Sequence, residues 1–315
     1  MRATLHQLRV FQQVAAVMSY TEAASLLRLT QPAVSIQIKQ LETNLDMPLL
    51  EKIGKKLFLM PAGQELEHFC GELFENIERM DMRLSAMKGS MEGELRLAAV
   101  TSAKYFTPHL LGAFHKLHPT VKLQLEVVNR SQIIRRLKDN ADDLVIMGLV
   151  PESMRLTCHP FVDNPIVIVA SPSHPLAQQK NIALTDLREH TFLFREAGSG
   201  TREIMAHFLQ SRNVELEAGM VLGSTETIKQ AVMAGLGISA VSRHSVTLEM
   251  ATQCLVELPV QHFPLLRSWY VVHHRSKQLS PVAQAFVDFI LDHQDRVADL
   301  CNRFLKKHFV EEPPD

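Results

Sequence analysis

The sequence predicts a multidomain protein with an all-α N-terminal domain carrying a small β-hairpin, a long linker helix, and a two-lobed α/β body. The chain has 315 residues, more than one ordinary domain of about 100–200 residues requires. Apolar residues recur at helical steps over most of residues 5–88, whereas strand and helix patterns alternate from residue 93 onward. Hydrophobic residues make up 46% of the chain and charged residues 21%, so the composition is that of a folded protein.

Charge is distributed unevenly, although the formal net charge is only −1. Residues 1–60 contain seven Lys or Arg and four Asp or Glu, and residues 61–92 contain three and seven, which gives net charges of +3 and −4. A basic N-terminal domain followed by an acidic helix favours a phosphate-binding domain attached to a ligand-binding body. We therefore expect three parts: residues 1–60, residues 61–92 and residues 93–315.

The first two predicted helices precede a short turn. The apolar stripe of the first helix consists of Leu5, Leu8, Phe11, Val14 and Met18. Thr21 offers an N-cap for a second helix over Glu22–Leu27, whose paired alanines allow another helix to approach closely. The turn spans Arg28–Thr30.

A third helix follows, with Thr30 as its N-cap and Pro32 in its first turn, where a missing N–H costs little. Its core-facing residues are Val34, Ile38, Leu41 and Leu45, and its opposite face carries Gln31, Pro32, Ser35, Ile36, Lys39 and Thr43.

A mixed polar, basic and apolar outer face is typical of a recognition helix in the major groove of DNA. Gln31 would pair with an adenine edge, and Ile36 would meet a thymine methyl group. Ser35 and Lys39 would reach phosphate or guanine. The alternative is a plain three-helix bundle whose outer face is merely solvated.

A basic hairpin follows the third helix. Residues 49–59 form two short apolar strands around a tip that contains Gly54. Lys52, Lys55 and Lys56 would contact the DNA backbone or minor groove and supply sequence-independent affinity. An ordinary solvated hairpin is the alternative.

The predicted linker helix carries a narrow apolar stripe with alternating steps of four and three residues. The stripe consists of Leu66, Cys70, Leu73, Ile77, Met80, Leu84 and Met87. This is a coiled-coil period, so we expect the helix to pair with a second copy, which would place two reading modules on successive half-sites. The alternative is that the stripe packs on the protein's own body. Gly89 and Gly93 bracket a predicted hinge.

The body is predicted to form two α/β lobes. Strands at Leu95–Val100, Val121–Val127 and Leu144–Met147 alternate with helices, an order that indicates a parallel sheet with right-handed crossovers. A second set starts at Ile166–Ser171, and the chain returns to the first lobe with a strand at Trp269–His273. Lobe I would comprise residues 93–164 and 267–295, lobe II residues 165–266, and a C-terminal extension residues 296–315.

Polar residues follow several predicted strands, where ligands bind in open α/β sheets. In lobe I these residues are Thr101, Ser102, Asn129, Ser131 and Gly148. In lobe II they are Arg195, Gly198, Ser199, Gly200, Thr201, Arg202, Thr225 and Thr227. Helix N-termini attract anions and arginine adds charge-assisted hydrogen bonds, so the sequence predicts a small anionic ligand between the lobes.

Two stretches, LRVFQQVAAVMSYTEAASLLRLTQPAVSIQIKQLE (Leu8–Glu42) and PLLEKIGKKLFLMPAG (Pro48–Gly63), resemble the winged helix-turn-helix of LysR-type transcriptional regulators in order and spacing. Ile36 stands where that family usually has a polar residue, and Met60 replaces its usual threonine. Further stretches, including TSAKYFTPHLLGAF (Thr101–Phe114) and REAGSGTR (Arg195–Arg202), resemble the subgroup that controls Calvin-cycle (RuBisCO) operons.

The resemblance implies a two-lobed effector domain of the periplasmic-binding-protein-like type 2 fold. It further implies a homodimer or a tetramer, promoter DNA and RNA polymerase as partners, and activation of carbon-fixation genes. The implied effectors are phosphorylated sugars, organic acids or NADPH, with no resident cofactor. A regulator of a different metabolic operon is the alternative within the family.

Two other classes of protein compete with a regulator. An enzyme would use Ser199 as nucleophile, but Ala197 breaks the GxSxG pattern and the loop lacks the lysine of a P-loop. His273 and His274 are adjacent on a strand and point to opposite faces, so no metal site is expected. A periplasmic solute-binding protein would need a signal peptide, and we expect a cytoplasmic protein instead.

Overall fold

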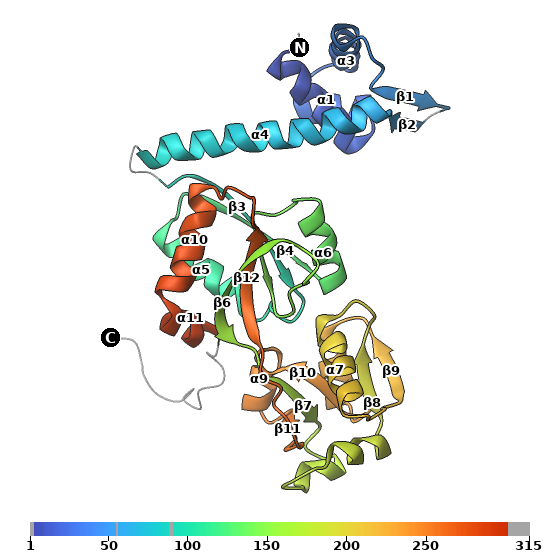
Figure 1. Ribbon diagram of the computed structural model, residues 1–315, viewed down its shortest axis with the longest axis vertical. Coiled ribbons are helices and arrows are strands. Elements are labelled where there is room, and N and C mark those ends of the chain that lie inside the picture. Colours follow the sequence, from blue (N-terminus) through green and yellow to red (C-terminus); the bar gives the residue numbers. More distant parts are fainter. Residues whose placement is uncertain (1–2, 55, 88–90, 302–315) are drawn as a thin grey trace. The chain divides into compact units, whose positions relative to one another are not determined.

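The computed structural model describes residues 3–54, 56–87 and 91–301 (Figure 1). The chain divides into two compact units, Met1–Leu84 and Ser85–Asp315. The first unit thus contains both the predicted N-terminal domain and almost all of the linker helix. Among the described residues, every helix is too short or too polar to cross a membrane.

The first unit consists of three helices, a hairpin and a long helix. The elements are α1 (Leu5–Val17), α2 (Tyr20–Leu27), α3 (Gln31–Leu45), β1 (Leu50–Ile53), β2 (Lys56–Leu59) and α4 (Pro61–Met87). The predicted cap of α2 is wrong: the Ser19 hydroxyl accepts the Glu22 N–H, and Thr21 lies exposed in the first turn. Both residues are good caps, and the extended backbone of Ser19 decides between them.

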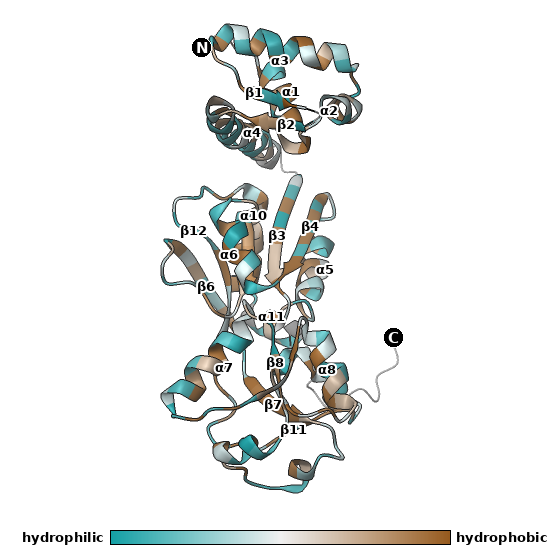
Figure 2. Ribbon diagram, turned by 90° about the vertical axis from the view of Figure 1, so that its right-hand side faces the viewer, coloured by the Kyte–Doolittle hydropathy of each residue, from teal (hydrophilic) through white to brown (hydrophobic). Residues whose placement is uncertain are grey.

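The core of this unit is built from one face of each helix. Val34, Ile38 and Leu41 of α3 are buried there, as their spacing predicted, and Leu45 packs at the edge. The α3 ribbon accordingly alternates between hydrophilic and hydrophobic colours (Figure 2).

The linker-helix stripe divides into two parts. Leu66 and Cys70 are buried in the core of the first unit, and Leu73 and Ile77 pack against it. For Leu66 and Cys70 the predicted pairing with a partner helix is therefore wrong, because their side chains already contact their own domain. Further along, Met80 and Leu84 are about half exposed, with 54% and 49% of their surface accessible.

Lobe I of the second unit is a five-stranded sheet in the order β4-β3-β5-β12-β6. Its elements are β3 (Gly93–Val100), α5 (Thr107–Leu117), β4 (Val121–Val128), α6 (Arg130–Lys138), β5 (Leu144–Met147), β6 (Leu156–Asp163), β12 (Ser268–His274), α10 (Pro281–Asp292) and α11 (Gln294–Cys301). Strands β4, β3 and β5 are parallel as predicted, and β12 runs antiparallel to both of its neighbours, β5 and β6. The start of the predicted C-terminal extension belongs to α11, whose Val297 is buried.

Lobe II contains an antiparallel sheet in the order β10-β7-β11 and the parallel pair β8-β9. Its elements are β7 (Ile166–Ala170), β8 (Phe192–Arg195), α7 (Gly200–Ser211), β9 (Ala218–Leu222), α8 (Thr225–Met233), β10 (Ser239–Ser242), α9 (Thr247–Ala251) and β11 (Val256–Glu257), with 3-10 turns at Pro175–Gln178, Leu184–Glu189 and Arg243–Ser245. The Leu193 N–H donates to the Ile238 carbonyl (2.8 Å) and links β8 to the segment before β10.

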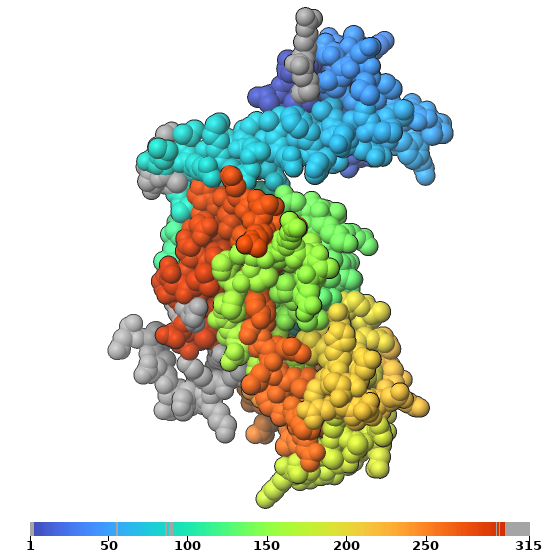
Figure 3. Space-filling view, in the orientation of Figure 1, coloured from blue at the N-terminus to red at the C-terminus, as the bar shows by residue number. Residues whose placement is uncertain are grey.

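The chain crosses between the lobes at the two predicted positions. The Asn164 N–H donates to the Arg267 carbonyl (2.7 Å), so the two crossing segments lie side by side. The buried Asn164 side chain accepts the Ser242 hydroxyl (2.7 Å), and the Trp269 indole donates to His244 (3.3 Å). Figure 3 shows the two lobes in contact over the face drawn there. The residues after β3 and β5 of lobe I and the start of α7 of lobe II border one hollow.

Candidate functional site: a DNA-reading face and an interlobe hollow

The outer face of α3 is open to solvent. Gln31, Ser35 and Lys39 are exposed, as is Pro32 in the first turn. Ile36 is 55% exposed, whereas Ile38 on the opposite face is 1% exposed. The Thr30 hydroxyl accepts the Ala33 N–H (3.4 Å) and caps the helix, and no acidic residue lies in the first turn. The positive end of the helix is thus available to phosphate.

The β1–β2 hairpin is tied directly to α3. The Glu42 carboxylate accepts the N–H groups of Leu49 (2.9 Å) and Leu50 (3.3 Å), which fixes the hairpin relative to the recognition helix. Sequence reasoning missed this role of Glu42. Lys52 and Lys56 are exposed on the hairpin, and Lys55 lies outside the described residues.

The interlobe hollow is open to solvent, and the space between its walls is ≈ 390 Å³ when the solvent at its mouth is included. Six predicted residues line it: Thr101, Ser102, Gly148, Ser199, Gly200 and Thr201. The lining residues that sequence reasoning missed are Val100, Arg130, Leu149, Asn164, Ile166, Ile204 and Trp269.

The N-terminus of α7 is the part of the hollow best suited to an anion. Ser199 is its N-cap, yet the serine hydroxyl makes no capping hydrogen bond. The residue is 4% exposed and lines the hollow. A helix start with uncapped N–H groups and a buried hydroxyl can donate several hydrogen bonds to one phosphate or carboxylate group.

The two arginines predicted to bind the ligand have protein partners instead. Arg195 is 4% exposed and donates to Glu196 (2.7 and 2.9 Å), Thr225 (2.5 Å) and, across the lobes, Thr101 (3.2 Å). Arg202 donates to the Arg195 carbonyl (2.8 Å) and lies over the Phe194 ring. Neither lines the hollow, although Arg195 contacts the lining residue Thr101. Their orientation depends on neighbours that spacing alone does not reveal.

The remaining predicted residues stand around the hollow rather than in it. Asn129 caps α6 by accepting the Gln132 N–H (3.1 Å) and also accepts the Ser131 hydroxyl (2.8 Å). The Ser131 N–H donates across the lobes to the Gly198 carbonyl (3.2 Å). Thr225 is buried behind Arg195, and exposed Thr227 bonds to Ser224.

A further interlobe contact joins Tyr105 to α8. The Tyr105 hydroxyl of lobe I donates to Glu226 of lobe II (3.1 Å), and Lys229 pairs with Glu226 (3.0 Å) and Glu249 (2.6 Å). Burial and the neighbouring Glu226 carboxylate raise the pKa of Tyr105, so its hydroxyl stays protonated and keeps donating. Burial opposes ionisation of Glu226, but hydrogen bonds from Lys229 and Gln230 hold its pKa below the ordinary value.

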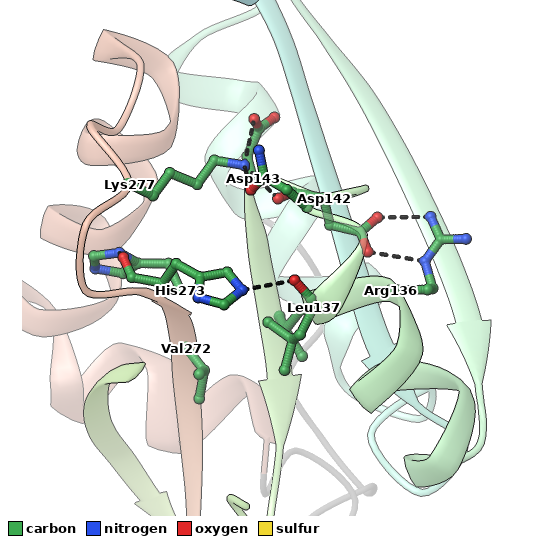
Figure 4. Close-up of a pocket in the computed structure, with 10 residues that line it drawn as sticks. Arg136, Leu137, Asp142, Asp143, Val272, His273 and Lys277 are labelled. Atoms are coloured by element: carbon green, nitrogen blue, oxygen red, sulfur yellow. Dashed lines mark hydrogen bonds and ion pairs between the residues drawn. The ribbon is translucent and has the colours of Figure 1, made fainter. Parts of the chain in front are cut away.

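A pocket in lobe I is filled by ion pairs (Figure 4). Arg136 binds Asp142 through two hydrogen bonds (2.8 and 2.7 Å), and Lys277 donates to the Asp142 carbonyl (2.6 Å). His274 bonds to the Leu137 carbonyl (2.6 Å), whereas the His273 ring bonds to the His274 carbonyl (2.9 Å). These contacts stabilise the lobe, and the described residues contain no group of three ligands arranged for a metal ion.

An exposed helix of a helix-turn-helix, joined to a two-lobed domain with a polar hollow between its lobes, is typical of a ligand-responsive DNA-binding regulator. The model of the bacterial regulatory helix-turn-helix protein, lysR family, matches residues 5–64, and the LysR substrate binding domain matches residues 88–295. The chain belongs to the LysR family of transcriptional regulators.

Its relatives of known name share most of its length. It is 42% identical over 297 residues to the RuBisCO operon transcriptional regulator of Allochromatium vinosum, covering 94% of this chain and 98% of the relative. It is 40% identical to the transcriptional activator CmpR of Synechocystis, with 94% and 97% coverage.

Two solved structures are informative in different ways. The CcmR regulatory domain of Synechocystis in complex with 2-PG is 42% identical, with a TM-score of 0.62, and covers 64% of this chain and 97% of that chain. Full-length CbnR complexed with its target DNA is 22% identical, with a TM-score of 0.64 and coverage of 92% and 99%. At that identity, the likeness to CbnR shows the fold alone.

Proposed function

We propose that this protein activates carbon-fixation genes by binding their promoter DNA and that a small phosphorylated acid bound between its lobes controls this activity. The observation that carries the proposal is the identity of about 40% to named RuBisCO operon regulators over more than nine-tenths of the chain. The name of one relative, transcriptional activator CmpR, supports activation rather than repression.

The DNA-binding part of the proposal assigns roles to exposed residues of the first unit. Gln31 and Ile36 would read base edges, while Ser35, Lys39, Lys52 and Lys56 would hold the backbone. A DNA partner also places the protein in the cytoplasm. RNA polymerase would be the second macromolecular partner at an activated promoter.

Assembly is proposed to use the exposed end of the linker helix. Met80 and Leu84 continue the apolar stripe beyond the core of the first unit, and Met87 is 84% exposed. Pairing of two such helices would remove this apolar surface from water and present two recognition helices to successive half-sites. A homodimer, or a tetramer made from two dimers, follows from this arrangement.

The proposed effector class follows from the chemistry of the hollow. The related CcmR regulatory domain binds 2-PG, 2-phosphoglycolate, a molecule with a phosphate and a carboxylate. The hollow offers the N-terminus of α7, the hydroxyls of Thr101 and Ser102, and the Arg130 guanidinium. The same hydrogen-bond donors would also bind sugar phosphates, other organic acids or NADPH, which are the alternative effectors.

A thermal-shift screen of the full chain tests the effector class, because a bound ligand raises stability by mass action. At a hundred times its Kd, a ligand should add about 2.7 kcal/mol to the stability of the folded chain. We expect 2-phosphoglycolate to raise Tm and glycolate at the same concentration to leave it unchanged. Equal shifts from both compounds, or from neither, would contradict a phosphate-dependent site.

A further inference from the structure

Arg130 is the single charged side chain among the described residues that line the interlobe hollow. It occupies the first position of α6, directly after the Asn129 cap, and its side chain is 14% exposed. A cation at a helix N-terminus meets the positive end of the helix dipole, and α6 has no acidic residue in its first turn to offset this. Arg130 therefore needs an anion from elsewhere in the molecule.

Glu203 of lobe II supplies that anion across the hollow. The Arg130 Nη1 group donates to Glu203 Oε2 (2.7 Å), and its Nε group donates to the Leu149 carbonyl (2.9 Å). Glu203 lies in the first turn of α7, where the helix dipole stabilises its negative charge. The two helix N-termini are thus joined by one ion pair that bridges the lobes.

The guanidinium has capacity for a second anion. An arginine carries five N–H donors, and Leu149 and Glu203 engage two of them. The Arg130 stem packs closely on the α7 start, since a Cβ added at Gly200 would lie 3.3 Å from Arg130 Cδ. A phosphate held by the α7 N-terminus would therefore reach the same guanidinium that Glu203 binds.

We propose that Arg130 senses the charge of the effector and that Glu203 is its built-in competitor, an inference that rests on the proposed function. A bound phosphate would take the Arg130 guanidinium and repel the Glu203 carboxylate, so that binding exchanges an interlobe ion pair for a protein–ligand one. Glu203 then sets the minimum charge that an effector needs: a monoanion binds too weakly to displace the Glu203 carboxylate from Arg130, whereas a phosphorylated acid displaces it. The exchange gives the ligand different contacts in two arrangements of the lobes, as a switch requires.

Isothermal titration calorimetry on the full chain tests this exchange with 2-phosphoglycolate and glycolate as probes. Glu203→Gln removes the competitor's charge, so 2-phosphoglycolate should bind about threefold to tenfold more tightly, and glycolate binding should become detectable. Arg130→Met should weaken 2-phosphoglycolate binding at least about thirtyfold, because a partly buried charge loses its partner. The double variant Arg130→Met with Glu203→Gln should resemble Arg130→Met in affinity.

A matched control uses an ion pair confined to lobe II. Arg243 binds Glu257 at 2.6 Å with similar partial exposure, and neither residue lines the hollow, so Glu257→Gln should leave both affinities unchanged. Tm and affinity for nonspecific DNA show whether each variant is folded. If Glu203→Gln binds 2-phosphoglycolate equally or more weakly than the parent, the pair is only a structural bridge and the inference is overturned. If the parent binds no phosphorylated acid, the proposed effector class is wrong and the inference falls with it.

Discussion

Ile36 and Ile38 lie two positions apart on α3, and substituting each in turn distinguishes effects on the stability of the DNA-binding domain from effects on DNA binding. Ile38 is 1% exposed in the core, and Ile36 is 55% exposed on the outer face. Ile38→Ala leaves a cavity and should lower the free energy of unfolding by about 2–5 kcal/mol. Ile36→Ala should change that free energy by no more than about 0.5 kcal/mol, because its side chain makes few contacts within the domain.

Ile36→Ala should, in contrast, weaken the binding of DNA. If its side chain buries about 60 Å² of apolar surface against a thymine methyl, the loss at about 25 cal/mol per Å² is about 1.5 kcal/mol, or roughly tenfold in affinity per half-site. Thermal unfolding measures the first quantity, and fluorescence anisotropy with a promoter fragment measures the second. An Ile36→Ala variant that is as destabilised as Ile38→Ala, or that binds promoter and random DNA as the parent does, would contradict the proposed role of Ile36.

Three further predictions follow from the same structure. Gln31→Ala should reduce discrimination between promoter and random DNA, whereas Lys56→Ala should weaken binding to both and lower the salt dependence of binding by about one ion. Fluorescence anisotropy at several salt concentrations measures both effects. Identical behaviour of the two variants would contradict the roles assigned to these residues. Gly198→Ala should lower the free energy of unfolding by about 1–3 kcal/mol, because its φ is +90° and the new Cβ would lie 2.7 Å from the Ser131 hydroxyl of the other lobe. An unchanged Tm would contradict this and would show that the loop relaxes to accommodate the methyl group. Burial holds the pKa of His273 below its ordinary 6.5, so the unfolded chain takes up a proton first and stability should fall as pH drops through 6.5. Thermal unfolding measured from about pH 7.5 to 5.5 should show a smaller fall in Tm for His273→Gln than for the parent. Equal slopes of Tm against pH for the two proteins would contradict this.

The local periodicity of the sequence predicted the helices and strands that bury one face and expose the other. The spacing of Val34, Ile38 and Leu41 placed the core face of α3 correctly because a helix repeats every 3.6 residues regardless of its neighbours. The parallel strands β3, β4 and β5 followed from alternating strands and helices. Strand β6 was missed because it is an edge strand that contains Pro160, which lacks an N–H and weakens the strand signal.

Features that depend on distant contacts were beyond the sequence. A heptad stripe shows that Leu66 and Cys70 need an apolar partner, but it does not show that this partner is their own domain. Ser199, Gly200 and Thr201 line the hollow at the start of α7, and their place between a strand and a helix could be inferred from local sequence. The charged group that lines the hollow is Arg130, and its role is set by Glu203, which lies 73 positions further along the chain.

Footprinting of the full chain on DNA upstream of carbon-fixation genes, with and without 2-phosphoglycolate, tests whether this ligand controls promoter binding. We expect protection of two half-sites about one helical turn apart, and a change in the protected region or in the affinity for DNA when the phosphorylated acid is added. A chain that protects no such DNA at low salt, or whose footprint and affinity stay the same at saturating 2-phosphoglycolate, would contradict this expectation.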